Sequence, residues 1–149
     1  MTTVHDVAAY ILAKKGQMTA MKLQKLVYYS QAWSLVWDEK PIFAEPIEAW
    51  ANGPVAPALY AKHRGSFEVG ALAGGSKDAL SPAERETVDT VLQTYGDFTA
   101  AQLSELTHSE APWRDARESL APGERGSKEI THADLAEFYG ALYKAKVES

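Results

Sequence analysis

The sequence predicts a mainly α protein: a compact single-domain bundle of about six helices with one short β-hairpin after the second helix. Three observations support this prediction. Apolar residues recur at helical spacing, capping sequences precede several of these stretches, and proline and glycine cluster between them. The length of 149 residues suits one domain with one core, so we expect residues 1–149 to form a single domain.

The first predicted helix lies close to the start of the chain. Apolar residues recur at helical spacing over residues 4–12, and Thr3 and Asp6 stand in the register of a capping box. Gly16 follows where a residue with positive φ can end a helix at low cost. We therefore expect an amphipathic helix of about twelve residues.

The second predicted helix follows a cap at Thr19 and carries a broad apolar surface. Its apolar positions on one side are Leu23, Leu26, Val27, Trp33 and Trp37. Tyr28, Tyr29 and Leu35 widen this stripe beyond one face. We expect this helix to be the central and most buried one, because a helix that is apolar nearly all round must be surrounded by protein.

The same two helices, joined by residues 16–19, also resemble a helix-turn-helix motif. In that arrangement Lys22 and Lys25 would face DNA. The broad apolar stripe argues against a groove-facing helix, and both lysines could instead lay their aliphatic stems over the core and keep their ammonium groups in water. A DNA-binding regulator of its own operon remains the alternative function.

The predicted hairpin occupies the stretch after Pro41. Residues Ile42–Trp50 are rich in Ile, Phe and Trp, which favours strands, and Asn52-Gly53-Pro54 has the composition of a turn. Pro57 suits the first turn of a short helix that carries Tyr60 and ends by Gly65.

The second half predicts a loop and four more helical segments. Residues 66–80 turn to Gly, Ala and Ser without a period, and we expect a mobile loop there. Ser81 to Glu84 combine a cap, a proline at the first helical position and a capping-box glutamate. Further helices are predicted after Thr99, between Ser109 and Ser119, and after Thr131, with a polar loop at residues 122–127.

Composition and charge exclude several classes of protein. The chain has no cysteine, which rules out disulfides, thiol catalysis and cysteine-ligated metals and fits the cytoplasm. The start of the chain is neither a signal peptide nor a membrane span, so we expect no membrane association. The net charge is −5, and residues 66–149 hold fifteen acidic against eight basic residues. Nucleic-acid binding is therefore not favoured.

The sequence contains no catalytic, metal or cofactor motif. The four histidines form no ligand set of familiar spacing, so we expect no metal site and no cofactor. No nucleophile with an adjacent base is readable, so we expect no enzyme. His108 and Glu110 are the one pair that could serve a small hydrolase, although they could equally tether the turn before Trp113.

Three blocks of sequence together resemble a known family. The blocks are Lys22–Trp33 (KLQKLVYYSQAW), Pro46–Val55 (PIEAWANGPV) and Leu106–Trp113 (LTHSEAPW). In this order and spacing they resemble the Panacea antitoxin domain, the family of the SocA-type antitoxins and the phage-associated GepA-like proteins. The resemblance covers roughly residues 5–142.

The resemblance implies an antitoxin of a toxin–antitoxin system, with a link to phage defence through the phage-associated members. Members neutralise different toxins encoded in adjacent genes, mostly by direct protein binding, so a hetero-oligomer with the cognate toxin is implied. The SocA-type branch instead delivers its toxin to the ClpXP protease. Neither activity follows from composition or periodicity.

Two sets of candidate residues follow. Tryptophan is enriched among interface anchors, and rigid turns hold a surface in place. The candidate toxin contacts are Trp50, Asn52, Gly53, Pro54, His108, Glu110 and Trp113. The family-motif residues expected to hold the fold are Lys22, Leu23, Lys25, Leu26, Tyr28, Tyr29, Trp33, Tyr60 and Pro112. Residues 78–118, with nine acidic and three basic residues, are a further candidate surface for a basic toxin.

Overall fold

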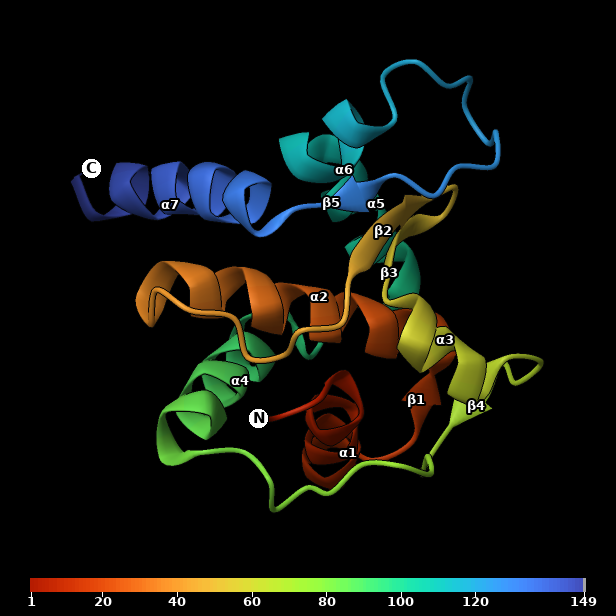
Figure 1. Ribbon diagram of the computed structural model, residues 1–149, viewed down its shortest axis with the longest axis vertical. Helices are drawn as coiled ribbons and strands as arrows, with labels where there is room; N and C mark the ends of the chain where they lie inside the picture. Colours follow the sequence, from red (N-terminus) through yellow and green to blue (C-terminus); the bar gives the residue numbers. More distant parts are fainter. Residues whose placement is uncertain (149) are drawn as a thin grey trace.

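The computed structural model describes residues 1–148 (Figure 1). Within this range lie seven helices, α1 Val4–Lys15, α2 Ala20–Trp37, α3 Pro57–His63, α4 Pro82–Tyr95, α5 Ala100–Ser109, α6 Ala111–Ala116 and α7 His132–Glu148. Five short strands accompany them, β1 Met18–Thr19, β2 Ile47–Trp50, β3 Gly53–Val55, β4 Glu68–Val69 and β5 Glu129–Ile130. The predicted mainly α fold is confirmed.

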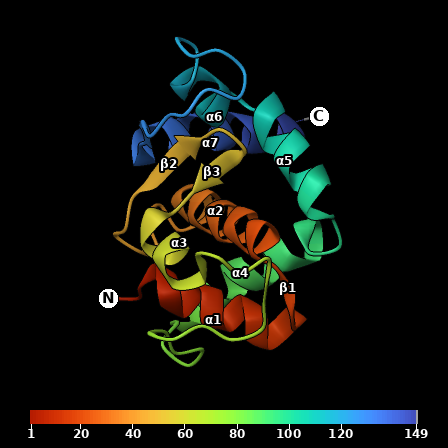
Figure 2. The ribbon, with the colours of Figure 1, turned by 90° about the vertical axis from the view of Figure 1, so that its right-hand side faces the viewer.

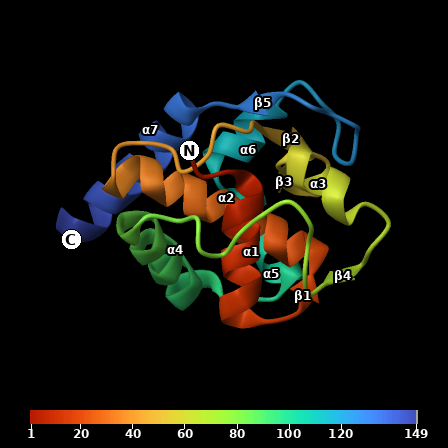
Figure 3. The same ribbon diagram turned by 60° about the horizontal axis from the view of Figure 1, so that its bottom comes forward.

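Helix α2 is the centre of the fold. It contacts α1, α4, α5, α7 and strand β3, with α7 on one side of it and α1 and α4 on the other in Figure 1. Figure 2 shows α5 along a third side, and Figure 3 shows α1 crossing over α2. Every residue from Leu23 to Ser34 is buried. The sequence prediction of a central, most buried helix is therefore confirmed.

The predicted helix starts are confirmed at the level of single hydrogen bonds. Thr3, Ser81 and Thr99 each accept a hydrogen bond from the backbone three residues on, and the residue at that position reaches back to complete a capping box. Thr19 caps α2 through the backbone N–H of Lys22. These side chains satisfy donors that a helix cannot satisfy internally.

The hairpin exists, but its strands lie later in the chain than the sequence predicts. Strands β2 and β3 pair in antiparallel register, with Trp50 opposite Gly53 and Ala49 opposite Pro54. Gly53 and Pro54 are therefore strand residues rather than turn residues, and Ala51 and Asn52 make the turn. Pro54 can occupy a strand because β3 lies at the edge of the sheet, where a missing N–H costs no ladder bond.

The first part of the predicted hairpin, Ile42–Pro46, is not a strand. Ile42 and Phe43 are buried in irregular backbone, and a side chain of α2 takes the place of a neighbouring strand. The side-chain oxygen of Gln31 accepts from the Ile42 N–H at 2.8 Å, and its amide nitrogen donates to the Phe43 carbonyl at 2.8 Å. A glutamine on the central helix thus holds this segment in place.

Two pairings between distant segments are absent from the sequence prediction. Strand β5 pairs with β2 and extends the hairpin to three strands. Strand β4 pairs with β1 and lies within the predicted loop of residues 66–80, which also buries Val69 and Leu80. Strands of two residues are too short to show an alternation of apolar and polar residues in the sequence. The mobility of residues 66–80 stays a prediction.

The capping box of α4 provides a test of these local assignments. Replacing Ser81 by alanine removes the acceptor for the Glu84 N–H, which lies 3.2 Å from the Ser81 hydroxyl. We expect the free energy of unfolding to fall by about 1 kcal/mol in urea denaturation. The control is Ser119→Ala at an exposed position outside any helix cap. Equal stability of the two variants would contradict the assignment.

Candidate functional site

The buried carboxylate of Glu110 links helices α2, α6 and α7. One oxygen of Glu110, at the junction of α5 and α6, accepts hydrogen bonds from the hydroxyls of Tyr29 and Tyr139, both at 2.7 Å. The Tyr28 and Tyr139 hydroxyls lie 3.0 Å apart. Burial raises the pKa of the Glu110 carboxyl, an effect that the two tyrosine hydrogen bonds oppose. Glu110 therefore ties α6 to α2 and α7.

This position removes Glu110 from the surface that a partner can reach without rearrangement, since the residue is only 8% exposed. A further tyrosine, Tyr95 on α4, packs against this cluster. The ring of Tyr29 stacks on Tyr95 with centroids 4.1 Å apart, and the Tyr95 hydroxyl accepts from the Trp33 indole at 3.0 Å. Of the family-motif residues, Tyr28, Tyr29 and Trp33 thus lie in the interior, and their role in holding the fold stays a prediction.

Lys25 lies fully buried beneath the hairpin, with an exposed fraction of 0%. Within residues 1–148 its ammonium nitrogen has no hydrogen-bond partner, and burial lowers the pKa of Lys25 to about 8. A Cβ atom on Gly53 would overlap the end of the Lys25 side chain, so a larger residue at this position would require Lys25 to move. Gly53 also has a φ of 129°, a value that favours glycine.

The burial of Lys25 corrects two expectations. The side chain does not extend its ammonium group into water, and it cannot contact the phosphates of DNA. Lys22 is half-buried, and burial lowers its pKa. The second helix therefore lacks the pair of exposed lysines on which the helix-turn-helix alternative depends.

Helices α5 and α6 support the turn of the hairpin through two side chains. The His108 ring stacks on Trp113 with centroids 3.8 Å apart, and the Ser104 hydroxyl of α5 donates to the Asn52 carbonyl at 3.1 Å. The Trp113 indole donates to the Trp50 carbonyl at 2.8 Å. Burial lowers the pKa of His108, and the nearby charge of Lys25 acts in the same direction. The stacking of His108 on Trp113 spans the turn between α5 and α6, in keeping with the structural alternative that the sequence left open for His108.

The predicted toxin contacts therefore differ in how far their side chains are exposed to solvent. Asn52 is exposed, and Trp50, His108 and Trp113 are half-buried. Gly53, Pro54 and Glu110 are buried. Among the family-motif residues, Leu23, Leu26 and Pro112 are buried and Tyr60 is half-buried. The structure thus brings the exposed candidates together on one face around the hairpin turn.

A hollow of about 770 Å³ opens beside this turn. Trp50 and Tyr60 form its aromatic wall, with ring centroids 5.0 Å apart. Glu48 and Arg125 supply one charge of each sign, and the loop of residues 123–127 closes the far side. Aromatic side chains with polar groups beside them are typical of sites that bind protein anchors.

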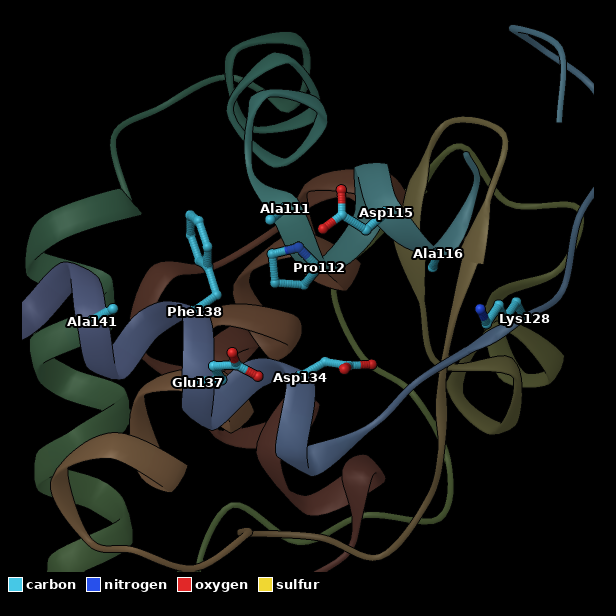
Figure 4. Close-up of a pocket in the computed structure, with 9 residues that line it drawn as sticks. All are labelled: Ala111, Pro112, Asp115, Ala116, Lys128, Asp134, Glu137, Phe138 and Ala141. Carbon is cyan, nitrogen blue, oxygen red and sulfur yellow. The ribbon is translucent and has the colours of Figure 1, made fainter. Parts of the chain in front are cut away.

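A second hollow, of about 380 Å³, lies between α6 and α7 (Figure 4). Pro112 and Phe138 face each other across it, with small alanines beside them. Asp115 from α6 and Asp134 and Glu137 from α7 surround it, and Lys128 lies at one end. We call this hollow the α6–α7 groove.

Sequence reasoning missed Arg117, which supports this face, and the contact between Tyr139 and Glu110. Arg117 is buried, donates to the Ala49 carbonyl at 3.0 Å and to the Glu124 carbonyl, and lies over the Trp113 ring. It thereby holds the loop of residues 121–128 against the hairpin. The helical spacing of α7 identifies Tyr139 as a core position, but no sequence signal connects it to Glu110, which is 29 positions earlier.

Within residues 1–148, no three His, Asp or Glu side chains converge in a way that could hold a metal ion. None of the helices in that range is long and apolar enough to span a bilayer.

Comparisons with known proteins match this chain to one family. A family model described as "Antitoxin SocA-like, Panacea domain" matches residues 23–114, more than half of the chain. The match runs from α2 into α6 and includes the hairpin and its supporting helices. Helix α7, which supplies Tyr139 and one wall of the α6–α7 groove, lies beyond it. No curated protein and no solved structure matches the chain.

The buried Lys25 leads to a prediction on stability. Lys25→Met keeps an unbranched side chain up to the ε position and removes an ammonium group that burial disfavours. We expect the variant to be more stable than the wild type at neutral pH, by up to about 3 kcal/mol, because one pKa unit corresponds to about 1.4 kcal/mol. Urea denaturation measures this difference, with Lys77→Met at an exposed position as the control.

The advantage of Lys25→Met should depend on pH. The unfolded lysine keeps its proton up to 10.5, whereas the folded one loses it near a pKa of about 8. Between these values the unfolded state binds more protons, so the wild type gains stability as the pH rises. The difference in free energy of unfolding between the variant and the wild type should therefore be largest below pH 8 and shrink towards pH 10.5. A difference that does not change with pH would rule out the buried ammonium group as its cause.

Glu110 leads to a second prediction. Glu110→Ala leaves two buried tyrosine hydroxyls without their acceptor, and each such group costs about 1–3 kcal/mol. We expect a loss of at least about 2 kcal/mol in urea denaturation, whereas Glu110→Gln, which retains a side-chain oxygen, should lose less. A Glu110→Ala variant as stable as the wild type would show that Glu110 does not hold the helices together.

Proposed function

Because the chain belongs to the SocA-like antitoxin family of Panacea domains, we propose that it neutralises a cognate toxin by direct protein–protein binding. The family match over residues 23–114 is the observation that carries this proposal. The toxin is the product of the adjacent gene, and the two proteins meet as a hetero-oligomer in the cytoplasm. The proposal makes the chain a stoichiometric binder.

The hollow beside the hairpin turn is the proposed contact surface for the toxin. Trp50 and Tyr60 offer an aromatic wall that a side chain of the partner can fill. The hydrogen bonds from Ser104 and Trp113 to the hairpin backbone keep this wall in place before binding. A surface that is already ordered loses less entropy on association, which favours tight binding.

A binding role rather than an enzymatic one is part of the same proposal. The two residues that could serve a hydrolase are occupied by structural contacts. Glu110 accepts from two tyrosines, and the His108 ring is stacked on Trp113. Catalysis would require these groups to face a substrate in a shared cleft.

Coexpression tests the proposal directly. The open reading frame adjacent to this gene is expressed alone and then together with this protein. We expect growth arrest by the neighbour and rescue by coexpression. Rescue that persists in a strain without ClpXP supports sequestration, whereas rescue that requires ClpXP supports delivery for proteolysis. A neighbour that is equally harmful, or equally harmless, in both cases would refute the proposal.

A substitution in the hollow tests the contact surface. Ala51 lines the hollow at the hairpin turn, and Ala51→Arg places a long charged side chain there. We expect the variant to bind the toxin at least about tenfold more weakly, because substitutions at the centre of an interface cost the most binding energy. Its circular dichroism spectrum should be unchanged. The control is Ala73→Arg, at an exposed position in the segment of residues 66–80. Equal binding by both variants would remove the hollow from the interface.

A further inference from the structure

The α6–α7 groove combines an apolar floor with an acidic rim. Pro112 and Phe138 provide the floor, and Asp115, Asp134 and Glu137 stand around it with exposed side chains. Lys128 is the single basic residue in its lining. The volume of about 380 Å³ falls in the range of about 300–1,000 Å³ that is typical of ligand pockets.

We propose that this groove docks a basic segment of the cognate toxin, a step that rests on the proposed function above. Lysine and arginine carry a long aliphatic stem and a charged head. The stems fit against Pro112 and Phe138, and the heads pair with the carboxylates of the rim. A groove with both features selects such side chains over purely apolar or acidic ones.

The available carboxylates favour this occupant. Glu137 is exposed on α7 beside Phe138, and no ion pair within residues 1–148 engages it. Asp115 has Arg114 at 3.7 Å, but this pair is exposed and therefore weak. Asp134 also accepts from the Thr131 N–H in the cap of α7, so it is left unaltered in the test.

Charge beyond the groove supports the same occupant. Residues 66–149 hold fifteen acidic and eight basic residues. This excess attracts a basic partner over several ångströms and raises the rate of association, and salt screens the attraction.

The groove walls are fixed by the buried network. Tyr139 of α7 donates to Glu110, which lies directly before α6, so one hydrogen bond sets the distance between the two helices. Trp113 of α6 donates to the Trp50 carbonyl, which joins the groove to the hairpin turn. The groove and the hollow beside the turn therefore lie on one connected scaffold, and a single toxin can contact both.

The test uses the full chain and the product of the adjacent open reading frame. Asp115→Lys/Glu137→Lys reverses the charge of the rim, and Asp115→Asn/Glu137→Gln removes it. The control is Glu86→Lys, which changes the net charge as much as the neutralised double variant does, at an exposed position on α4 across α2 from the groove (Figure 1). Circular dichroism and thermal unfolding check the fold of each variant.

Association rates are measured by stopped-flow at low and at high salt. We expect the charge-reversed variant to associate about tenfold more slowly or worse at low salt and to lose its salt dependence. The neutralised variant should lie between it and the wild type, and Glu86→Lys should stay within about twofold of the wild type.

Each outcome is decisive. Equal rates for the wild type and both groove variants would overturn the groove proposal and leave the antitoxin proposal intact. An equal loss in Glu86→Lys would assign the effect to net charge rather than to the groove and overturn the proposal too. A wild-type homodimer that the groove substitutions dissociate would make a second copy the occupant. A neighbour that neither binds nor is neutralised would overturn both proposals.

Discussion

The whole structure depends on the burial of α2 from Leu23 to Ser34. A helix that is enclosed on all sides must find a hydrogen-bond partner inside the protein for every polar side chain it carries. Gln24 bonds to both backbone groups of Ala56, and Gln31 bonds to Ile42 and Phe43. Ser34 donates to the carbonyl of Lys40. The polar residues of the central helix thus position the irregular segments that surround it.

Lys25 is the exception to this pattern, and it lies directly below the candidate surface. Its ammonium group is buried against Gly53 of the hairpin. One turn of α2 further along, Tyr29 donates to Glu110, and the hydrogen bonds of Glu110 join α2 to α6 and α7. Two buried ionisable groups therefore determine how the hairpin and α6 sit on the central helix. A binding protein needs this order, because a fixed surface loses little entropy when its partner arrives.

Much of the fold could be predicted from local signals. Capping residues such as Thr3 and Ser81 act within one turn, so a short stretch of sequence specifies each helix start. The strand pairs could not be predicted, since β2 with β5 and β1 with β4 join segments far apart in the chain. The hairpin prediction failed at Ile42 because a glutamine side chain replaced the partner strand.

The sequence by itself determined the helical class, the capped helix starts, the buried character of α2 and the resemblance to the Panacea antitoxins. Periodicity and caps are local, and motif blocks are read in order along the chain. Only the tertiary structure decided which motif residues face outwards. It buried Glu110 and Lys25, left Trp50 beside a hollow, and assembled an acidic groove from α6 and α7. Burial depends on what packs against a residue, and that is a property of the folded chain as a whole.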